Sequence, residues 1–213
     1  SLLFEPAGRS ISLGSVFVQD TIALTERLDL TLGWKFEDAP FSGWESLPDL
    51  RLAWRLSDDH LLWAAASRAI RAPTPFDRDV LERAGGMTSP VGNTSFRPER
   101  VHAYQLGYRG QPLANLALSV STFYNVHDDL RTVEWGPPPT LLPLTWGNNM
   151  EGETYGVEAW AKWQVSEWWR LSPGVRILRT SLELKPDTIP VLGLEQAGND
   201  PRWQGLLTSS VDL

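Results

Sequence analysis

The chain has 213 residues, of which 42% are hydrophobic and 21% charged, with a net charge of -7, no cysteine and 11 tryptophans. This composition excludes disorder, a disulfide scaffold and a cysteine nucleophile, and the acidic balance argues against a nucleic-acid partner. No run approaches the roughly eighteen apolar residues of a membrane helix, whereas barrel strands, which alternate apolar and polar residues, stay possible.

Period-two alternation recurs along the chain and predicts an all-β, antiparallel meander of about nine strands. The clearest example runs from Leu28 to Glu37, with leucines and aromatics on one face and polar residues on the other. The predicted strands cover residues 10–24, 28–37, 49–56, 60–69, 104–109, 116–121, 155–164, 169–177 and 202–213.

The predicted connections alternate between short and long. Tight turns are expected at 25–27, 57–59, 110–114 and 166–167, and long polar loops at 38–48, 70–99, 126–152 and 180–201. Outer-membrane barrels have this asymmetry, since their periplasmic turns are short and their extracellular loops long. Trp and Tyr at both strand ends also favour a membrane barrel, where such rings lie at headgroup depth.

One helix is expected within the longest predicted loop. Residues 76–84 place Phe76, Val80, Leu81 and Ala84 on one helical face, follow Pro75 and precede Gly85 and Gly86. This pattern predicts about two turns of amphipathic helix that cap the sheet or barrel mouth.

Three arginines near the longest loop are candidates for binding an anionic ligand. Arg68, Arg71 and Arg97 lie at predicted strand ends, and guanidinium groups bind carboxylates and catecholates bidentately. The alternative, which we favour for Arg68 and Arg71, is pairing with lumen carboxylates such as Glu37 or Glu158.

Trp135 and Trp146 flank a proline-rich loop and could stack on a flat ligand, although such rings more often pack the loop itself. His127, Asp128 and Asp129 do not have metal-site geometry, because neighbouring strand residues point to opposite faces. We expect no metal site, no cofactor and no catalytic residue, since the sequence has no phosphate loop, dinucleotide fingerprint or nucleophile elbow.

Several segments, in order along the chain, resemble the barrel of TonB-dependent outer-membrane receptors. The first are Val16 to Asp20, followed by Leu28 to Lys35, in which Lys35 stands where the family usually has Arg. Ser67 to Pro73 resembles the element that begins a large extracellular loop. Further similar segments are Arg97 to Arg100, Tyr104 to Arg109 with Gln105 in place of the usual Glu, Phe123 to Leu130, and Asn148 to Glu158.

The resemblance implies a twenty-two-stranded up-and-down transmembrane barrel with an N-terminal plug, located in the cell outer membrane. It also implies uptake of ferric siderophores or similar scarce ligands, powered by the TonB system through the plug. Residues 1–213 would form a partial barrel without a plug domain, unable to transport alone. The competing interpretations are a soluble Trp-rich β-sandwich that binds carbohydrate and, less favoured, a barrel enzyme.

The sequence begins at Ser1 and ends at Leu213 within an alternating run, which we interpret as a piece of a longer protein. Such a piece has unpaired sheet edges and a leucine-rich face that meets lipid in the parent barrel. In water, we expect the sheet to curl so that its loops, or a second copy through self-association, cover that face.

Overall fold

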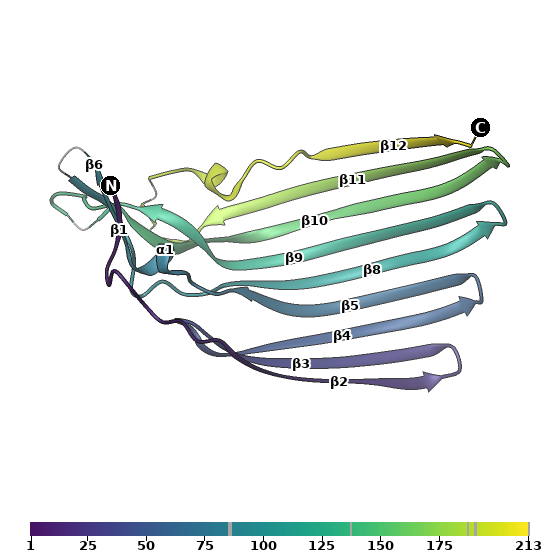
Figure 1. Cartoon of the computed structure of the whole chain (residues 1–213), viewed down its shortest axis with the longest axis horizontal. Helices are drawn as coiled ribbons and strands as arrows, with labels where there is room; N and C mark the ends of the chain where they lie inside the picture. Colours follow the sequence, from purple (N-terminus) through teal and green to yellow (C-terminus); the bar gives the residue numbers. More distant parts are fainter. Residues whose placement is uncertain (85–86, 137, 187, 190, 213) are drawn as a thin grey trace.

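The computed structural model describes residues 1–84, 87–136, 138–186, 188–189 and 191–212. Nine long strands form one antiparallel meander in which each strand pairs with its neighbours in the sheet (Figure 1). Three short strands bring the sheet to twelve, so the predicted all-β meander is confirmed. Among the described residues, no helix has the length and apolar character needed to cross a membrane.

The long strands follow one another across the sheet in chain order. They are β2 (Gly14–Thr25), β3 (Leu28–Ala39), β4 (Gly43–Ser57), β5 (His60–Arg71), β8 (Glu99–Leu113), β9 (Leu116–Glu134), β10 (Thr145–Ser166), β11 (Trp169–Leu184) and β12 (Trp203–Val211). The remaining elements are β1 (Leu2–Phe4), α1 (Pro75–Arg78), β6 (Val80–Ala84), β7 (Met87–Val91) and the 3-10 helix η1 (Leu194–Ala197).

All four tight turns lie at one end of the sheet (Figure 1). Each consists of the two residues between consecutive strands: Glu26-Arg27, Asp58-Asp59, Ala114-Asn115 and Glu167-Trp168. The other connections, with α1 and η1, lie at the opposite end. The predicted asymmetry between the two ends is therefore confirmed.

Two of the predicted long loops are largely strand. The connection between β3 and β4 is only Pro40 to Ser42, and β9 and β10 leave only residues 135–144 between them, instead of 38–48 and 126–152. These strands continue past the alternating region as paired hairpins in which apolar and polar residues no longer alternate. From Gly147 to Gly152, register shifts on both sides of the buried Met150 interrupt the period of two, although the backbone ladder continues.

The predicted helix over 76–84 is shorter than expected. The helix α1 ends at Arg78, and residues from Val80 onward form β6, which pairs with β1 from the start of the chain and with β7. Val80 is completely buried there. The apolar residues of this segment have helical spacing, but pairing with a distant strand makes it a β-strand.

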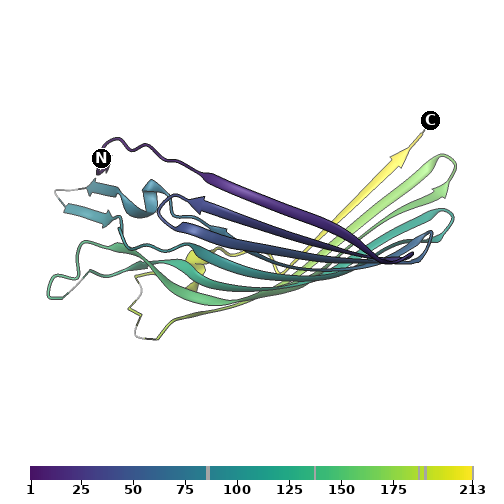
Figure 2. The same cartoon turned by 90° about the horizontal axis from the view of Figure 1, so that it is seen from below.

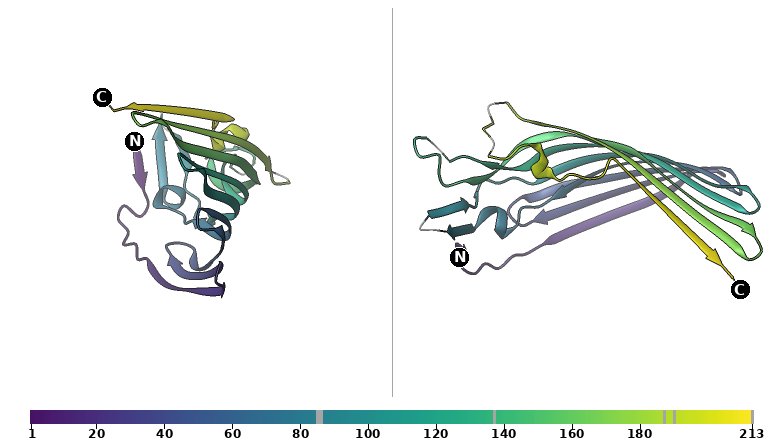
Figure 3. Two further views of the ribbon diagram at one scale, coloured as in Figure 1. Left: turned by 90° about the vertical axis from the view of Figure 1, so that its right-hand side faces the viewer. Right: turned by 90° about the horizontal axis from the view of Figure 1, so that it is seen from above.

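The sheet is strongly twisted and curls around one open side (Figures 2 and 3). The element α1 and the short strands β1 and β6 lie on the concave side (Figure 3). Because alternate residues of a strand point to opposite faces, the register defines an outer face with Leu32, Leu50, Ala66, Tyr104 and Tyr124 in successive positions across five strands. The odd-numbered charged residues predicted to oppose the leucines, such as Arg51 and Arg55, belong to the inner face.

Aromatic side chains mark both ends of the outer face. Tyr104, Tyr124 and Tyr155 lie side by side on β8, β9 and β10, with ring centroids 6.4 and 6.5 Å apart. On β10, Trp163 lies eight residues from Tyr155, which is roughly 27 Å along a strand. With the strand tilt of about 35–45° found in outer-membrane barrels, this separation corresponds to a band about 20 Å high, which is comparable to the lipid-facing band of such a barrel.

The outer apolar side chains remain uncovered. Leu32, Trp34, Leu50 and Trp54 are 42, 45, 43 and 50% exposed. The expectation that the loops cover this face is wrong for the described residues, because the sheet curls with its apolar face outward and α1 lies on the other side. Coverage by a second copy in water stays a prediction.

Leu52 lies in the middle of the outward apolar run of β4, and Ala53 beside it faces inward. We expect Leu52→Arg to lower the free energy of unfolding in lipid by about 2–4 kcal/mol, because it places a charge in the hydrocarbon. Ala53→Arg is the matched control and should cost less than about 1 kcal/mol, since Asp29 lies directly opposite on β3. Denaturant unfolding in bilayers measures both values, and equal costs would contradict the assignment of the two faces.

Candidate functional site

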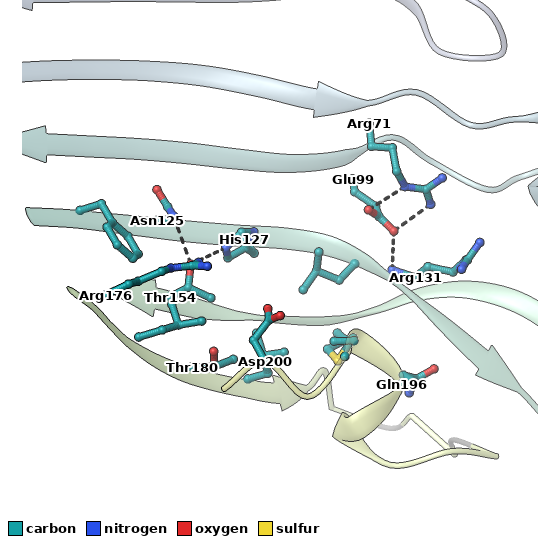
Figure 4. A pocket seen from close by; sticks show the side chains of 17 residues that line it. Arg71, Glu99, Asn125, His127, Arg131, Thr154, Arg176, Thr180, Gln196 and Asp200 are labelled. Atoms are coloured by element: carbon teal, nitrogen blue, oxygen red, sulfur yellow. Dashed lines mark hydrogen bonds and ion pairs between the residues drawn. The ribbon is translucent and has the colours of Figure 1, made fainter. Parts of the chain in front are cut away.

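A cavity of about 520 Å³ lies on the inner face, between β9 to β11 and the segment that carries η1 (Figure 4). The segment is held to β9 by two hydrogen bonds, in which the backbone N–H of Val133 donates to Gln196 and that of Val191 donates to the Val133 carbonyl. The lining is polar toward the loop end and apolar near Leu130, Met150, Leu178 and Leu182.

A cluster of four charged groups lies at the loop end of the cavity. The Arg71 guanidinium donates two hydrogen bonds of 2.8 Å to the Glu99 carboxylate, and its Nη1 lies 3.1 Å from Asp77. Arg131 binds the other oxygen of Asp77 at 3.2 Å, and its backbone N–H donates to Glu99 at 2.9 Å. The cluster joins β5, β8 and β9 to α1, and we name these four residues the loop-end cluster.

Asp77 is fully buried, and its position follows from the local sequence of α1. Thr74 is the N-cap and donates from both its backbone N–H and its hydroxyl to Asp77 at 2.8 Å, while Pro75 supplies the fixed φ of the first helical residue. Burial raises the pKa of the Asp77 carboxyl, but hydrogen bonds from Thr74 and Arg71 outweigh it and leave the pKa below its ordinary value. Asp77 is therefore a carboxylate at neutral pH.

The wall of the cavity carries a smaller polar group. The Thr154 hydroxyl lies 3.1 Å from Asn125 Nδ2 and 3.0 Å from His127 Nε2, and all three side chains project toward the cavity (Figure 4). Arg176 and Asp200 complete the polar lining on the β11 side. The cavity thus presents cations, amides and hydroxyls together with an apolar floor, a combination typical of sites for small polar ligands.

A second charge cluster surrounds Asp129 on β9. This carboxylate is almost completely buried and receives Arg97 at 2.6 Å, Arg100 at 2.8 Å and Lys185 at 2.7 Å. Burial lowers the pKa of Lys185, but the hydrogen bonds to Asp128 and Asp129 exceed that effect and raise it above the ordinary value. Asp129 has a φ of 58° beside a register shift in the β9–β10 ladder, so the bulge turns its side chain toward the cations.

The three predicted arginines lie in three different environments. Arg71 lines the cavity, Arg97 pairs with Asp129, and Arg68 lies opposite His102, two residues beyond the outward-facing Ala66. Arg68 pairs with Glu45, and Arg71 pairs with Glu99 and Asp77. Pairing with carboxylates is thus as expected, but the partners are not Glu37 or Glu158. Only Arg71 is brought to the cavity.

The two predicted tryptophans differ as well. Trp146 packs against Phe76 of α1, with centroids 5.4 Å apart, and the Arg131 guanidinium lies 4.9 Å from its ring. Its indole N–H is buried without a hydrogen-bond partner among the described residues. Trp135 is 41% exposed in the loop after β9.

Sequence reasoning missed Arg131, Glu99 and Asp77 as members of a site. A signal for Asp77 is present, because Thr74 and Asp77 have the spacing of a capping box. No local signal joins Asp77 to Arg131, which lies 54 residues further on.

The His127 to Asp129 segment shows no grouping for a metal. His127 turns into the cavity and Asp128 pairs with Lys185 at 2.6 Å. Within the described ranges, no three His, Asp or Glu residues are grouped to hold a metal ion.

Comparison with known proteins gives a family and a fold. Residues 4–210 match the family described as TonB dependent receptor-like, beta-barrel. No curated protein sequence matches the chain significantly.

Solved structures share the fold at low sequence identity. The siderophore receptor PirA from Acinetobacter baumannii has 20% identity and a TM-score of 0.69, over 84% of this chain and 29% of its own. The ferric yersiniabactin uptake receptor FyuA from Yersinia pestis has 20% identity and a TM-score of 0.62, and the match covers 92% of this chain and 30% of the receptor. A variant of the ferric enterobactin receptor PfeA from Pseudomonas aeruginosa, in complex with enterobactin, has 19% sequence identity and a TM-score of 0.65. The match covers 79% of this chain and 27% of the receptor. The chain thus spans less than a third of these receptors.

Asp77→Asn should weaken the attachment of α1 by about 1–3 kcal/mol, because Arg71 and Arg131 lose a charged hydrogen-bond acceptor. Hydrogen exchange of the amides of residues 76–79 measures this loss, with Asp59→Asn in a distant turn as the control. Because the Asp77 pKa is lowered on folding, its contribution is complete above about pH 4 and is lost as the pH falls through the folded value. The difference between wild type and Asp77→Asn should therefore shrink as the pH falls below the ordinary range of an Asp carboxyl, and a difference that grows with acidification would contradict the assignment.

Proposed function

Because the chain belongs to the TonB-dependent receptor-like β-barrel family, we propose that it forms part of the wall of an outer-membrane receptor for ferric siderophores or similar scarce ligands. The family resides in the outer membrane and its members are transporters rather than enzymes. The outward apolar band between two aromatic rows supports the same location for this chain.

The observation that carries the proposal is the position of the loop-end cluster at one end of the 520 Å³ cavity. Arg71 and Arg131 come from β5 and β9, which are not neighbours in the sheet, and both residues line the cavity. An anionic chelate presents several carboxylate or catecholate oxygens, and planar guanidinium groups bind such oxygens bidentately. The cluster therefore supports recognition of an anionic ligand.

Arg131 is the stronger candidate of the two for direct contact. Arg71 already uses both edges of its guanidinium on Glu99 and Asp77, whereas the Arg131 side chain makes one ion pair of 3.2 Å and is 41% exposed. Its cation–π contact with Trp146 holds the guanidinium in place. A ligand oxygen can thus reach Arg131 without displacing the bidentate Arg71–Glu99 pair.

The remaining predicted residues have secondary parts in the proposal. Trp135, exposed near the cavity end of β9, is available to stack on a flat ligand, and Arg97 adds positive charge in the same loop region. Trp146 contributes through its contact with Arg131. Arg68, on an outer-face position, has no part in the inner cavity.

We propose further that this chain supplies barrel wall and no plug domain, and that uptake depends on a plug and on the TonB system. Support comes from the single sheet that contains all the long strands and from the family itself. Under this proposal the chain does not transport by itself. The soluble carbohydrate-binding alternative has no support from the comparisons.

Arg131→Gln should weaken binding of an anionic ferric chelate about tenfold or more, because a charge-assisted hydrogen bond is lost. Ferric enterobactin and ferric yersiniabactin, the ligands named for two of the solved relatives, are the probes, and isothermal titration in detergent is the measurement. Arg55→Gln, at the turn end and paired with Asp29, is the matched control. Unchanged affinity of Arg131→Gln, or an equal loss in Arg55→Gln, would contradict this site.

A further inference from the structure

Rows of inward-facing residues form the wall of the inner cavity. Each row runs across β9, β10 and β11, and the strand register defines them as Phe123–Gly156–Leu178, Asn125–Thr154–Thr180 and His127–Gly152–Leu182. The glycines leave β10 without a side chain in the first and third rows, and a Cβ on Gly156 would lie 2.7 Å from the Phe123 ring. The wall therefore has one polar row between two rows that end on leucine.

The middle row is polar but uncharged (Figure 4). Asn125 Nδ2 lies 3.1 Å from the Thr154 hydroxyl, and the Thr180 hydroxyl forms no hydrogen bond to the residues that the structure describes. Amides and hydroxyls both donate and accept hydrogen bonds. The row therefore suits an uncharged polar group of a ligand.

Apolar side chains lie on both sides of the middle row. Leu178 is 6% exposed and closes the floor, and Leu182 extends the apolar surface toward the loop end. These two leucines are four residues apart on β11, which is roughly 13 Å along a strand, and Thr180 lies between them. A ligand that matches this order has aliphatic arms on either side of a neutral polar group.

Positive and negative side chains around the cavity are balanced. Among the described residues, three of each lie there, namely Arg71, Arg131, Arg176, Glu99, Asp200 and, in contact with the first two arginines, Asp77. Arg176 is also paired with Glu158 at 3.4 Å. This wall thus has no excess of cations, and a chelate with several negative charges would meet carboxylates that repel it.

Ferric chelates differ in the charge that they carry. Each catecholate loses two protons, so a tris-catecholate leaves the ferric ion with a large negative excess. Each hydroxamate loses one proton, so a tris-hydroxamate cancels the charge of the ion. A neutral core with one anionic group suits a wall whose charges are balanced and whose Arg131 guanidinium is accessible.

We propose that the cavity binds a ferric tris-hydroxamate chelate that carries one anionic group. The anionic group lies at Arg131, the hydroxamate oxygens lie at the Asn125–Thr154–Thr180 row, and the methylene arms lie against Leu178 and Leu182. This inference rests on the function proposed above for the same cavity and narrows its class of ligand.

The test uses ferrioxamine B, a ferric tris-hydroxamate with methylene arms and one terminal amine. A succinyl cap on the amine leaves a carboxylate, whereas an acetyl cap leaves no charge. In isothermal titration of the full protein in detergent, we expect the succinyl form to bind about tenfold more tightly, because only this form makes a charge-assisted hydrogen bond. Arg131→Gln should abolish the difference. Ferric enterobactin, a tris-catecholate, should bind the wild type about tenfold less tightly than the succinyl form does.

The position of the arms is tested with a second variant. Leu182→Asn removes apolar contact from one arm and should weaken binding of both capped forms equally, by about tenfold. Leu206→Asn, also inward-facing but on β12 and outside the cavity lining, is the control and should bind both forms like the wild type. Far-ultraviolet circular dichroism establishes that each variant is folded.

The outcomes separate the parts of the proposal. Equal affinity of the wild type for the two capped forms, or a preference that persists in Arg131→Gln, would overturn the position of the anionic group. Unchanged affinity in Leu182→Asn, or an equal loss in Leu206→Asn, would overturn the position of the arms. Tighter binding of ferric enterobactin than of the succinyl form would overturn the ligand class but leave the proposed receptor function standing, whereas absence of binding by every probe would overturn both.

Discussion

The difference between the two faces of the sheet governs the structure. A barrel wall in a membrane has to present hydrocarbon-compatible side chains outward and satisfy every backbone N–H and C=O within the sheet. The ladders between neighbouring long strands meet the second requirement except along the outer edges of β2 and β12, which have no partner strand among the described residues. The outward leucines, valines and aromatic rings meet the first. Charged residues gather on the inner face and at the loop end, where the candidate functional site forms, although Asp20 and Arg179 occupy outward positions beside Leu32 and Tyr155.

Burial of carboxylates at the loop end makes pairing necessary. Asp77 and Asp129 are buried, and each is paired with two or three cationic groups from separate parts of the chain. Such pairs hold the long connections in defined positions over the sheet, because removing one partner leaves an uncompensated buried charge. Arg71 and Arg131 also line the cavity, so the residues that hold α1 are the ones for which we propose ligand binding.

The alternation in sequence predicted the strands and their faces well, because one face meets lipid and period two is enforced there. It failed where register shifts interrupt the alternation, as in the extended β9–β10 hairpin, and at Val80 to Ala84, where a distant strand supplies the pairing. For the site, Arg71 was predicted and its partners Asp77 and Glu99 were not. Contacts across 54 residues, such as Asp77 with Arg131, depend on strand order and register, which local patterns do not specify.

The central claim, that even-numbered residues of β4 face lipid and odd-numbered residues face the lumen, is tested most directly by spin labels placed singly from Asp49 to Leu56 in a bilayer. Accessibility to dissolved oxygen, which concentrates in hydrocarbon, should peak at Leu50, Leu52 and Trp54. Accessibility to a water-soluble nickel chelate should peak at Asp49, Arg51 and Ala53. Two profiles with opposite period-two phases are the predicted result, and profiles without alternation would contradict the claim.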